Sequence, residues 1–122
     1  MKIAVTSTGD GLASDVDGRF GRCNYFVIVD TETMELESID NQAQRAIGGA
    51  GVEAAQTLAS TDTEAVVTGN VGPNAYSALS SAGIEIYTGA TGSVKNAISE
   101  YKEGKLRKTE KSTTRGGRGK RI

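Results

Sequence analysis

Residues 65–88, "AVVTGNVGPNAYSALSSAGIEIYT", decide the fold because they place a strand, a helix and a second strand in succession. Residues 65–69 and 84–88 are short apolar runs of the kind found in buried strands. Between them apolar residues recur at helical spacing, with Pro73 where a helix would begin and Gly83 where it would end. Such a unit joins parallel strands by a right-handed crossover.

The first half of the chain indicates antiparallel strands. Lys2–Ser7 and Tyr25–Asp30 are apolar runs, and the second is uninterrupted, as expected of a central strand. Met34–Ile39 alternates apolar and acidic residues, which is typical of a half-exposed edge strand. Two more helices are expected, one after "IGGAG" (47–51) and one capped by Ser93.

This order of elements predicts an α/β fold with three helices on a mixed five-stranded sheet. The expected strand order is 3-2-1-4-5, with strand two antiparallel. The predicted domain covers residues 1–106. Residues 107–122 lack apolar periodicity and are expected to form a basic, disordered tail.

Charge is divided unevenly along the 122 residues. Residues 1–104 carry six basic and fourteen acidic side chains, whereas residues 105–122 carry eight basic side chains and one acidic side chain. Histidine is absent and Cys23 is the single cysteine, so an internal disulfide is excluded. No signal peptide or membrane span is recognisable, and we expect a cytoplasmic protein that does not bind membranes.

Three glycine-rich segments, at residues 7–22, 69–74 and 89–93, are expected to meet where strands one and four diverge, outside the carboxyl ends of the strands. Helix N-termini and nearby arginines there would favour an anion. An alternative is that these glycines only serve turn geometry. The candidate binding residues are Arg19, Phe20, Gly21, Arg22, Gly48, Gly49, Gly51, Gly72, Pro73 and Asn74.

Cys23 has two interpretations. It is a small packed apolar residue at the start of a strand, or it is a metal ligand whose thiol pKa is lowered by Arg19 and Arg22. One thiolate cannot complete a four-ligand zinc or iron–sulfur site. A metal at Cys23 would therefore require a preassembled cluster or a second chain.

Several catalytic patterns are missing from the sequence. "GATGSVKN" (89–96) lacks the Lys-Ser/Thr ending of a P-loop, and a histidine-based catalytic triad is impossible. No set of acid, base and nucleophile can be named, so we expect a protein that is not an enzyme.

Four motifs occur together and in order: "FGRCNYFVIVD", "GGAGVEAAQ", "VVTGNVGPNAYSAL" and "GIEIYTGATGSVKNAISEYKEGKL". In this combination the chain resembles the dinitrogenase iron–molybdenum cofactor biosynthesis family, including its orange-protein branch. The resemblance implies a ribonuclease-H-like fold and the carrying of a metal–sulfur cluster. Many members have histidine at the position of Arg19, and this difference favours non-covalent cluster binding here.

We therefore expect a non-enzymatic carrier of an anionic metal–sulfur cluster, of the iron–sulfur/molybdenum or molybdenum–copper type, that can be isolated as the apo protein. Its expected partners are cluster-assembly or acceptor proteins, and it is expected to be a monomer or weak homodimer that does not bind nucleic acid. The alternative is an interaction module whose basic tail docks an acidic protein or a nucleic acid.

Overall fold

The fold is that of a computed structural model in which residues 1–45 and 48–113 are described. The strands are β1 (Lys2–Ser7), β2 (Tyr25–Asp30), β3 (Leu36–Asp40), β4 (Thr63–Val67), β5 (Glu85–Thr88) and β6 (Arg107–Lys108). The helices are α1 (Ala50–Ala59), α2 (Pro73–Ser81), α3 (Val94–Lys102) and a 3₁₀ turn, η1 (Gln42–Arg45). Among these residues no helix is long and apolar enough to cross a bilayer.

The strands form one mixed sheet with the order β3-β2-β1-β4-β5-β6. β2 is antiparallel to both β1 and β3, while β4 and β5 continue from β1 in parallel. The predicted order of the first five strands and the antiparallel second strand are confirmed. The sheet therefore changes from antiparallel to parallel pairing at β1, as the strand–helix–strand unit indicated.

The expected count of five strands is wrong, because β6 adds a sixth. Tyr87 and Thr88 pair antiparallel with Arg107 and Lys108, and Thr109 N donates to Ile86 O at 2.7 Å. Two exposed basic residues carry no apolar alternation, so the sequence could not show this strand. The sheet continues past the boundary expected at Leu106, whereas residues 114–122 of the predicted tail lie outside the described residues.

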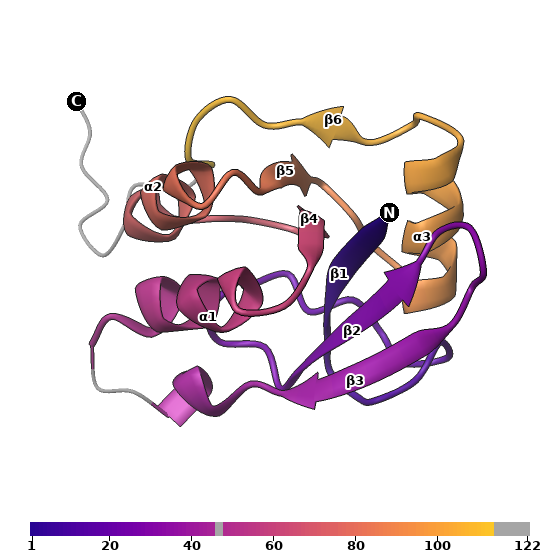
Figure 1. The fold of residues 1–122 in the computed structure, drawn as a ribbon, viewed down its shortest axis with the longest axis horizontal. Helices are drawn as coiled ribbons and strands as arrows, with labels where there is room; N and C mark the ends of the chain where they lie inside the picture. Colours follow the sequence, from indigo (N-terminus) through magenta and orange to yellow (C-terminus); the bar gives the residue numbers. More distant parts are fainter. Residues whose placement is uncertain (46–47, 114–122) are drawn as a thin grey trace.

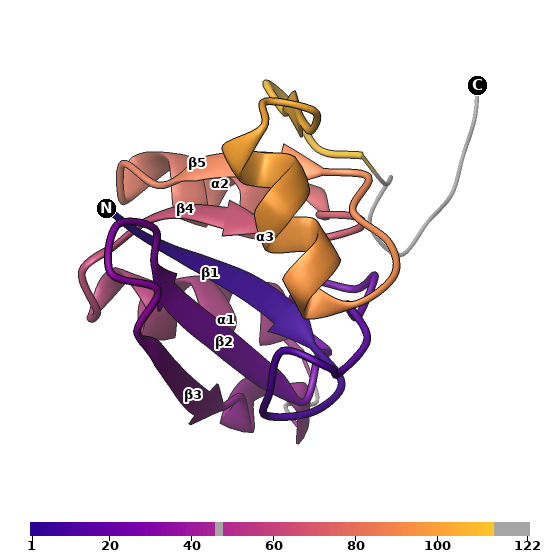
Figure 2. The ribbon, with the colours of Figure 1, turned by 90° about the vertical axis from the view of Figure 1, so that its right-hand side faces the viewer.

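Helices cover both faces of the sheet. Figure 1 shows α1 and α2 on one face and α3 on the other, and in Figure 2 α3 lies across the sheet. Two apolar clusters follow from this arrangement, one between the sheet and α1/α2 and one between the sheet and α3. β2 contributes to both, which explains why its sequence is apolar without interruption.

The edge strand β3 begins at Leu36, two residues later than expected. Asp30 Oδ1 accepts hydrogen bonds from the backbone N–H groups of Glu32 and Thr33, and Met34 has a left-handed φ of 63°. Met34 therefore belongs to the turn after β2 and not to the strand.

Three small residues allow the loop before β2, α1 and α2 to approach one another closely. A Cβ on Gly21 would lie 2.9 Å from Gly51 Cα, and a Cβ on Gly51 would lie 2.8 Å from Ala75 Cβ. Gly21 also has a φ of 83°, which other residues rarely adopt. The glycines here are thus required for packing between backbone segments.

We predict that Gly21→Ala lowers the free energy of unfolding by about 2–4 kcal/mol, because it adds both a strained φ and a clash with the backbone of α1. Urea unfolding followed by circular dichroism measures this change. Gly11→Ala is the control, since Gly11 has open space around it and no left-handed φ. Its effect should stay within about 0.5 kcal/mol. Equal stability of the two variants would contradict the close-contact interpretation.

Candidate anion-binding site

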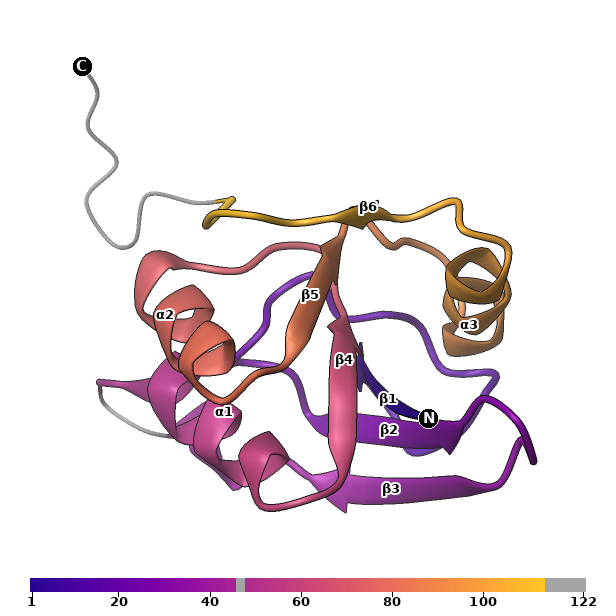
Figure 3. The same cartoon turned by 45° about the horizontal axis from the view of Figure 1, so that its top comes forward.

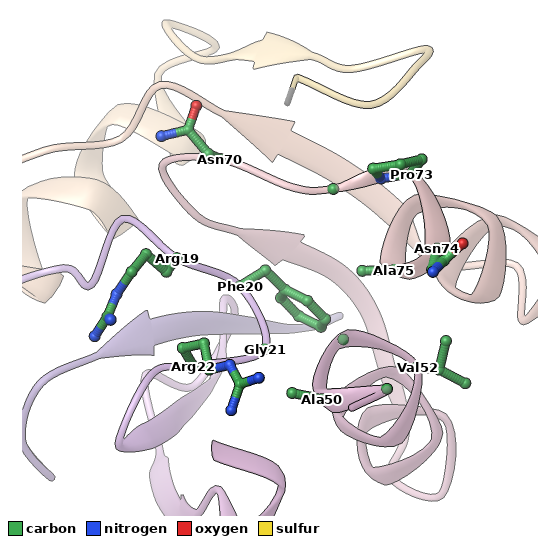
Figure 4. A pocket seen from close by; sticks show the side chains of 13 residues that line it. Arg19, Phe20, Gly21, Arg22, Ala50, Val52, Asn70, Pro73, Asn74 and Ala75 are labelled. Atoms are coloured by element: carbon green, nitrogen blue, oxygen red, sulfur yellow. The ribbon is translucent and has the colours of Figure 1, made fainter. Parts of the chain in front are cut away.

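A pocket of about 490 Å³ lies at the edge of the sheet where β1 ends and β2 begins. Three segments line it: the loop at 19–22, the start of α1 at 49–52, and the loop and first turn of α2 at residues 70 and 72–75. Figure 4 shows these segments facing one another around the opening. This is the position expected for a ligand site where strands diverge.

All of the predicted binding residues except Gly48 line the pocket. The structure adds Ala50, Val52, Asn70 and Ala75, which the sequence analysis did not name. Ala50 lies between the predicted Gly49 and Gly51, and Val52 directly follows Gly51, so their positions in the first turn of α1 could have indicated them. The predicted residues therefore come from three separate segments that the fold brings to one place.

The helices that begin at the pocket lack side-chain caps. α1 starts after Gly49 and α2 after Gly72, and neither of these N-caps makes a side-chain hydrogen bond. At α3, by contrast, the Ser93 hydroxyl accepts from Asn96 N at 3.0 Å. The N-cap residues therefore do not satisfy the first-turn N–H groups at the pocket, and these groups carry partial positive charge.

The two arginines of the pocket are held differently. Arg22 Nη1 donates to Gln44 O at 2.9 Å, and Figure 4 shows its side chain extending toward Ala50 at the start of α1. Arg19 extends away from this helix, and its Nε donates to Asp17 Oδ1 at 3.2 Å. Arg22 is therefore better placed to meet an anion at the helix start.

The Asp17 carboxylate accepts hydrogen bonds from both the side chain and the backbone of Arg19. This carboxylate is nearly buried, and it accepts from the backbone N of Arg19 at 3.0 Å. The hydrogen bond and charge of Asp17 raise the pKa of Arg19. The sequence analysis did not name this pair; the two-residue spacing could have indicated it, but not that the carboxylate is turned inward.

The ring of Phe20, which lies between Arg19 and Arg22 along the pocket lining, forms the apolar base of the pocket. Its side chain is 4% exposed, and its ring lies 5.7 Å from the ring of Phe26 on β2. The pocket thus combines an apolar base with cationic groups at its rim, and none of the described residues that line it is a carboxylate.

Cys23 is fully buried and does not line the pocket. Burial, together with the negative charge of Asp17, raises the pKa of the thiol to about 12. The expectation that Arg19 and Arg22 lower this pKa is wrong, because desolvation of the thiolate outweighs them. Asn41 Nδ2 lies 3.6 Å from Sγ and also donates to Cys23 O at 2.9 Å. The arrangement agrees with the interpretation of Cys23 as a packed apolar residue.

The third glycine-rich segment, residues 89–93, does not reach the pocket. Its Gly92 O accepts from Val16 N at 2.8 Å, and Ser93 pairs with Asp15. It therefore supports the other part of the loop between β1 and β2, on the side where α3 packs.

Fold and site together define a small α/β protein with an open, cationic pocket built from two helix starts and an arginine loop. Residues 1–104 match the dinitrogenase iron-molybdenum cofactor family, and the chain belongs to this family.

Known structures and sequences agree with this assignment. The apo orange protein from Desulfovibrio gigas is 40% identical, with a TM-score of 0.90 over 93% of this chain and 96% of that chain. A Thermotoga protein described as a NifB candidate is 37% identical, with a TM-score of 0.82 over 95% of this chain and 98% of that one. An uncharacterized protein of Methanocaldococcus jannaschii is 36% identical over 113 residues, covering 90% of this chain and 92% of its own.

We predict that the Cys23 thiol reacts slowly with iodoacetamide in the native protein, and that the rate does not level off between about pH 7 and pH 10. The pKa of about 12 leaves almost no thiolate in this range. In urea the rate should be higher and should level off above pH 9.0, the ordinary pKa of this thiol. A native-state rate that levels off at the same pH would show that burial does not raise the pKa of the thiol.

The raised pKa of the Cys23 thiol also makes the free energy of unfolding depend on pH. Unfolded Cys23 ionises near its ordinary pKa of 9.0, whereas the folded thiol stays protonated up to about 12. The free energy of unfolding should therefore fall above pH 9, relative to that of Cys23→Ala, and the relative difference should be constant below this pH. Parallel pH profiles for the two proteins up to pH 11 would contradict the assigned shift.

Proposed function

We propose that this protein is a non-enzymatic carrier whose cargo is an anionic metal–sulfur cluster of the iron–sulfur/molybdenum or molybdenum–copper type. One observation carries the proposal. Arg22 and the starts of α1 and α2, whose N-caps make no side-chain hydrogen bond, line the same pocket, and none of its described lining residues is a carboxylate. Membership in the family supports a cargo of this kind, because the family is named after the dinitrogenase iron–molybdenum cofactor.

The residues of the pocket fit a preassembled anion better than a bare metal ion. No group of three or more His, Cys, Asp or Glu side chains that could hold a metal ion gathers within residues 1–45 and 48–113. Backbone N–H groups and arginines instead donate hydrogen bonds, which suits sulfide or oxide atoms on the surface of a cluster. The apolar base at Phe20 would exclude water from one side of the cargo.

A carrier needs to hold its cargo without changing it and to release it to another protein. Non-covalent contacts at an open rim meet both needs, since no metal–thiolate bond has to be broken on transfer. We include cluster-assembly or acceptor proteins as the proposed partners of this exchange.

Anaerobic reconstitution tests the proposal. The protein is mixed with tetrathiomolybdate plus copper in one arm and with iron plus sulfide in another, desalted, and assayed for visible absorption and bound metal. We predict that Arg22→Gln weakens retention by roughly tenfold to a hundredfold, the range for one lost charge-assisted contact. Arg19→Gln should have a smaller effect, because Asp17 already pairs with Arg19.

Two controls accompany these variants. Lys95→Gln removes one charge from α3, on the other face of the sheet, and should leave retention unchanged. Cys23→Ala should also retain cargo, because the thiol does not line the pocket. Loss of cargo on Cys23→Ala alone would make the thiol a ligand and overturn the non-covalent mode. Absence of retained metal in both arms with the wild-type protein would overturn the carrier proposal for these clusters.

A further inference from the structure

Residues 107–113 cross from the edge of the sheet to the start of α2. They begin as β6, paired with β5, and then run toward α2, as Figure 3 shows. The hydroxyls of Thr88 and Thr109 share a buried hydrogen bond of 2.6 Å. Tyr76 OH on α2 then donates to Glu110 O at 2.5 Å. We call residues 107–113 the strap, because they join the sheet edge to this helix.

Thr113, in the strap, pairs with both backbone groups of Val71. Its N–H donates to Val71 O at 2.8 Å, and its hydroxyl accepts from Val71 N at 2.8 Å. Val71 is 1% exposed and directly precedes Gly72, the N-cap of α2. A buried N–H that loses its acceptor destabilises the fold. The contact therefore depends on a hydroxyl at position 113, which an apolar side chain of the same shape cannot replace.

The segment before α2 is also held from its other side. Asn70 N donates to Gly18 O at 2.8 Å, and Phe20 N donates to Asn70 O at 3.2 Å. The segment thus lies between the loop that carries the arginines and the strap. Gly69 and Gly72 flank it, and glycine allows many backbone conformations. Its position is therefore set by hydrogen bonds from the two sides and not by local conformational preference.

The strap contacts the chain on both sides of the helical turn that lines the pocket. Val71 precedes the N-cap, and the N–H of Tyr76 makes the first bond within α2, to Gly72 O at 2.9 Å. Residues 73–75 lie between these two contacts and line the pocket. The N–H groups of a helix start act on an anion only at short range. Their contribution to binding therefore depends on where this turn is held.

Building on the proposed function, we propose that Thr113 is a positioning residue of the cargo site, which holds the start of α2 where its N–H groups meet the anion. Thr113 does not line the pocket, so its effect passes through Val71 to the helix. Bound cargo and the Thr113–Val71 contact strengthen each other by the same factor, because such coupling is reciprocal. Opening of the strap therefore lowers the affinity for cargo, which gives a carrier a route to release.

The test uses the full chain and one probe, tetrathiomolybdate plus copper, titrated anaerobically and followed by visible absorption. Thr113→Val removes the hydroxyl with little change of shape and should weaken binding about threefold to tenfold, the range for one lost neutral hydrogen bond. Thr113→Ser keeps the hydroxyl and should restore binding close to that of the wild type. Equally weak binding by Thr113→Ser would show that the hydroxyl is not responsible and would overturn the inference.

Thr61→Val is the matched control for the loss of a threonine hydroxyl. Thr61 Oγ1 donates to Leu58 O at 2.7 Å and accepts from Thr63 N at 3.2 Å, so it too bonds two backbone groups. It lies before β4 begins, whereas the pocket lies after β4 ends. Its variant should bind the probe as the wild type does. An equal loss of binding in this control would assign the effect to general stability and overturn the inference.

Amide NMR of the apo protein measures the positioning without any cargo. In Thr113→Val the amide signals of Asn74 and Ala75 should shift, and the N–H of Val71 should exchange with solvent faster. Neither change is expected in Thr61→Val. In the wild type, the probe should slow exchange of the Val71 N–H. Unchanged signals of Asn74 and Ala75 in Thr113→Val would show that Thr113 does not hold the helix start.

The remaining outcomes separate this inference from the proposed function. Wild-type affinity in Thr113→Val, together with weak binding by Arg22→Gln, would overturn the inference and leave the carrier function in place. No binding of the probe by the wild type would overturn both proposals for this cluster.

Discussion

The contact among Gly21, Gly51 and Ala75 sets the spacing of the segments that surround the pocket. A Cβ on either glycine would come closer than 3.0 Å to its neighbour, so side chains there would push the arginine loop and α2 away from α1. This contact places two helix starts and the Arg19–Arg22 loop around one opening. The glycines thus act through packing, because they let the three segments approach one another closely.

The pocket is lined by positively charged side chains, whereas residues 1–104 as a whole carry a net negative charge. Residues 1–104 carry an excess of carboxylates, yet the pocket lining contains two arginines and none of those carboxylates. Partial charges at the starts of α1 and α2 add to the arginines, and the apolar base at Phe20 lowers the local polarity. A positive local potential attracts an anion even to an acidic protein. Groups in contact with the anion act on it strongly, whereas the charges of distant carboxylates are screened by salt.

Prediction from sequence succeeded where the signal is local. β1 and β2 have the predicted bounds, and Ser93 caps α3 as its position indicated. Prediction failed where the conformation of a segment depends on hydrogen bonds to another residue or strand. Met34 is drawn into a turn by the Asp30 carboxylate group, and Arg107–Lys108 becomes a strand only because β5 offers an edge to pair with.

The sequence by itself determined the α/β class, the order of the first five strands and the three segments that meet at the pocket, although it also placed residues 89–93 there, which do not reach it. These depend on apolar period, glycine and proline placement, and the handedness of crossovers, which are local or general properties. Tertiary structure alone decided that Cys23 is buried, that the Asp17 carboxylate beside Arg19 is turned inward, and that Thr113 is hydrogen-bonded to Val71, 42 residues away. Such features depend on desolvation and on contacts between distant residues, and neither is encoded in the spacing of residues along the chain.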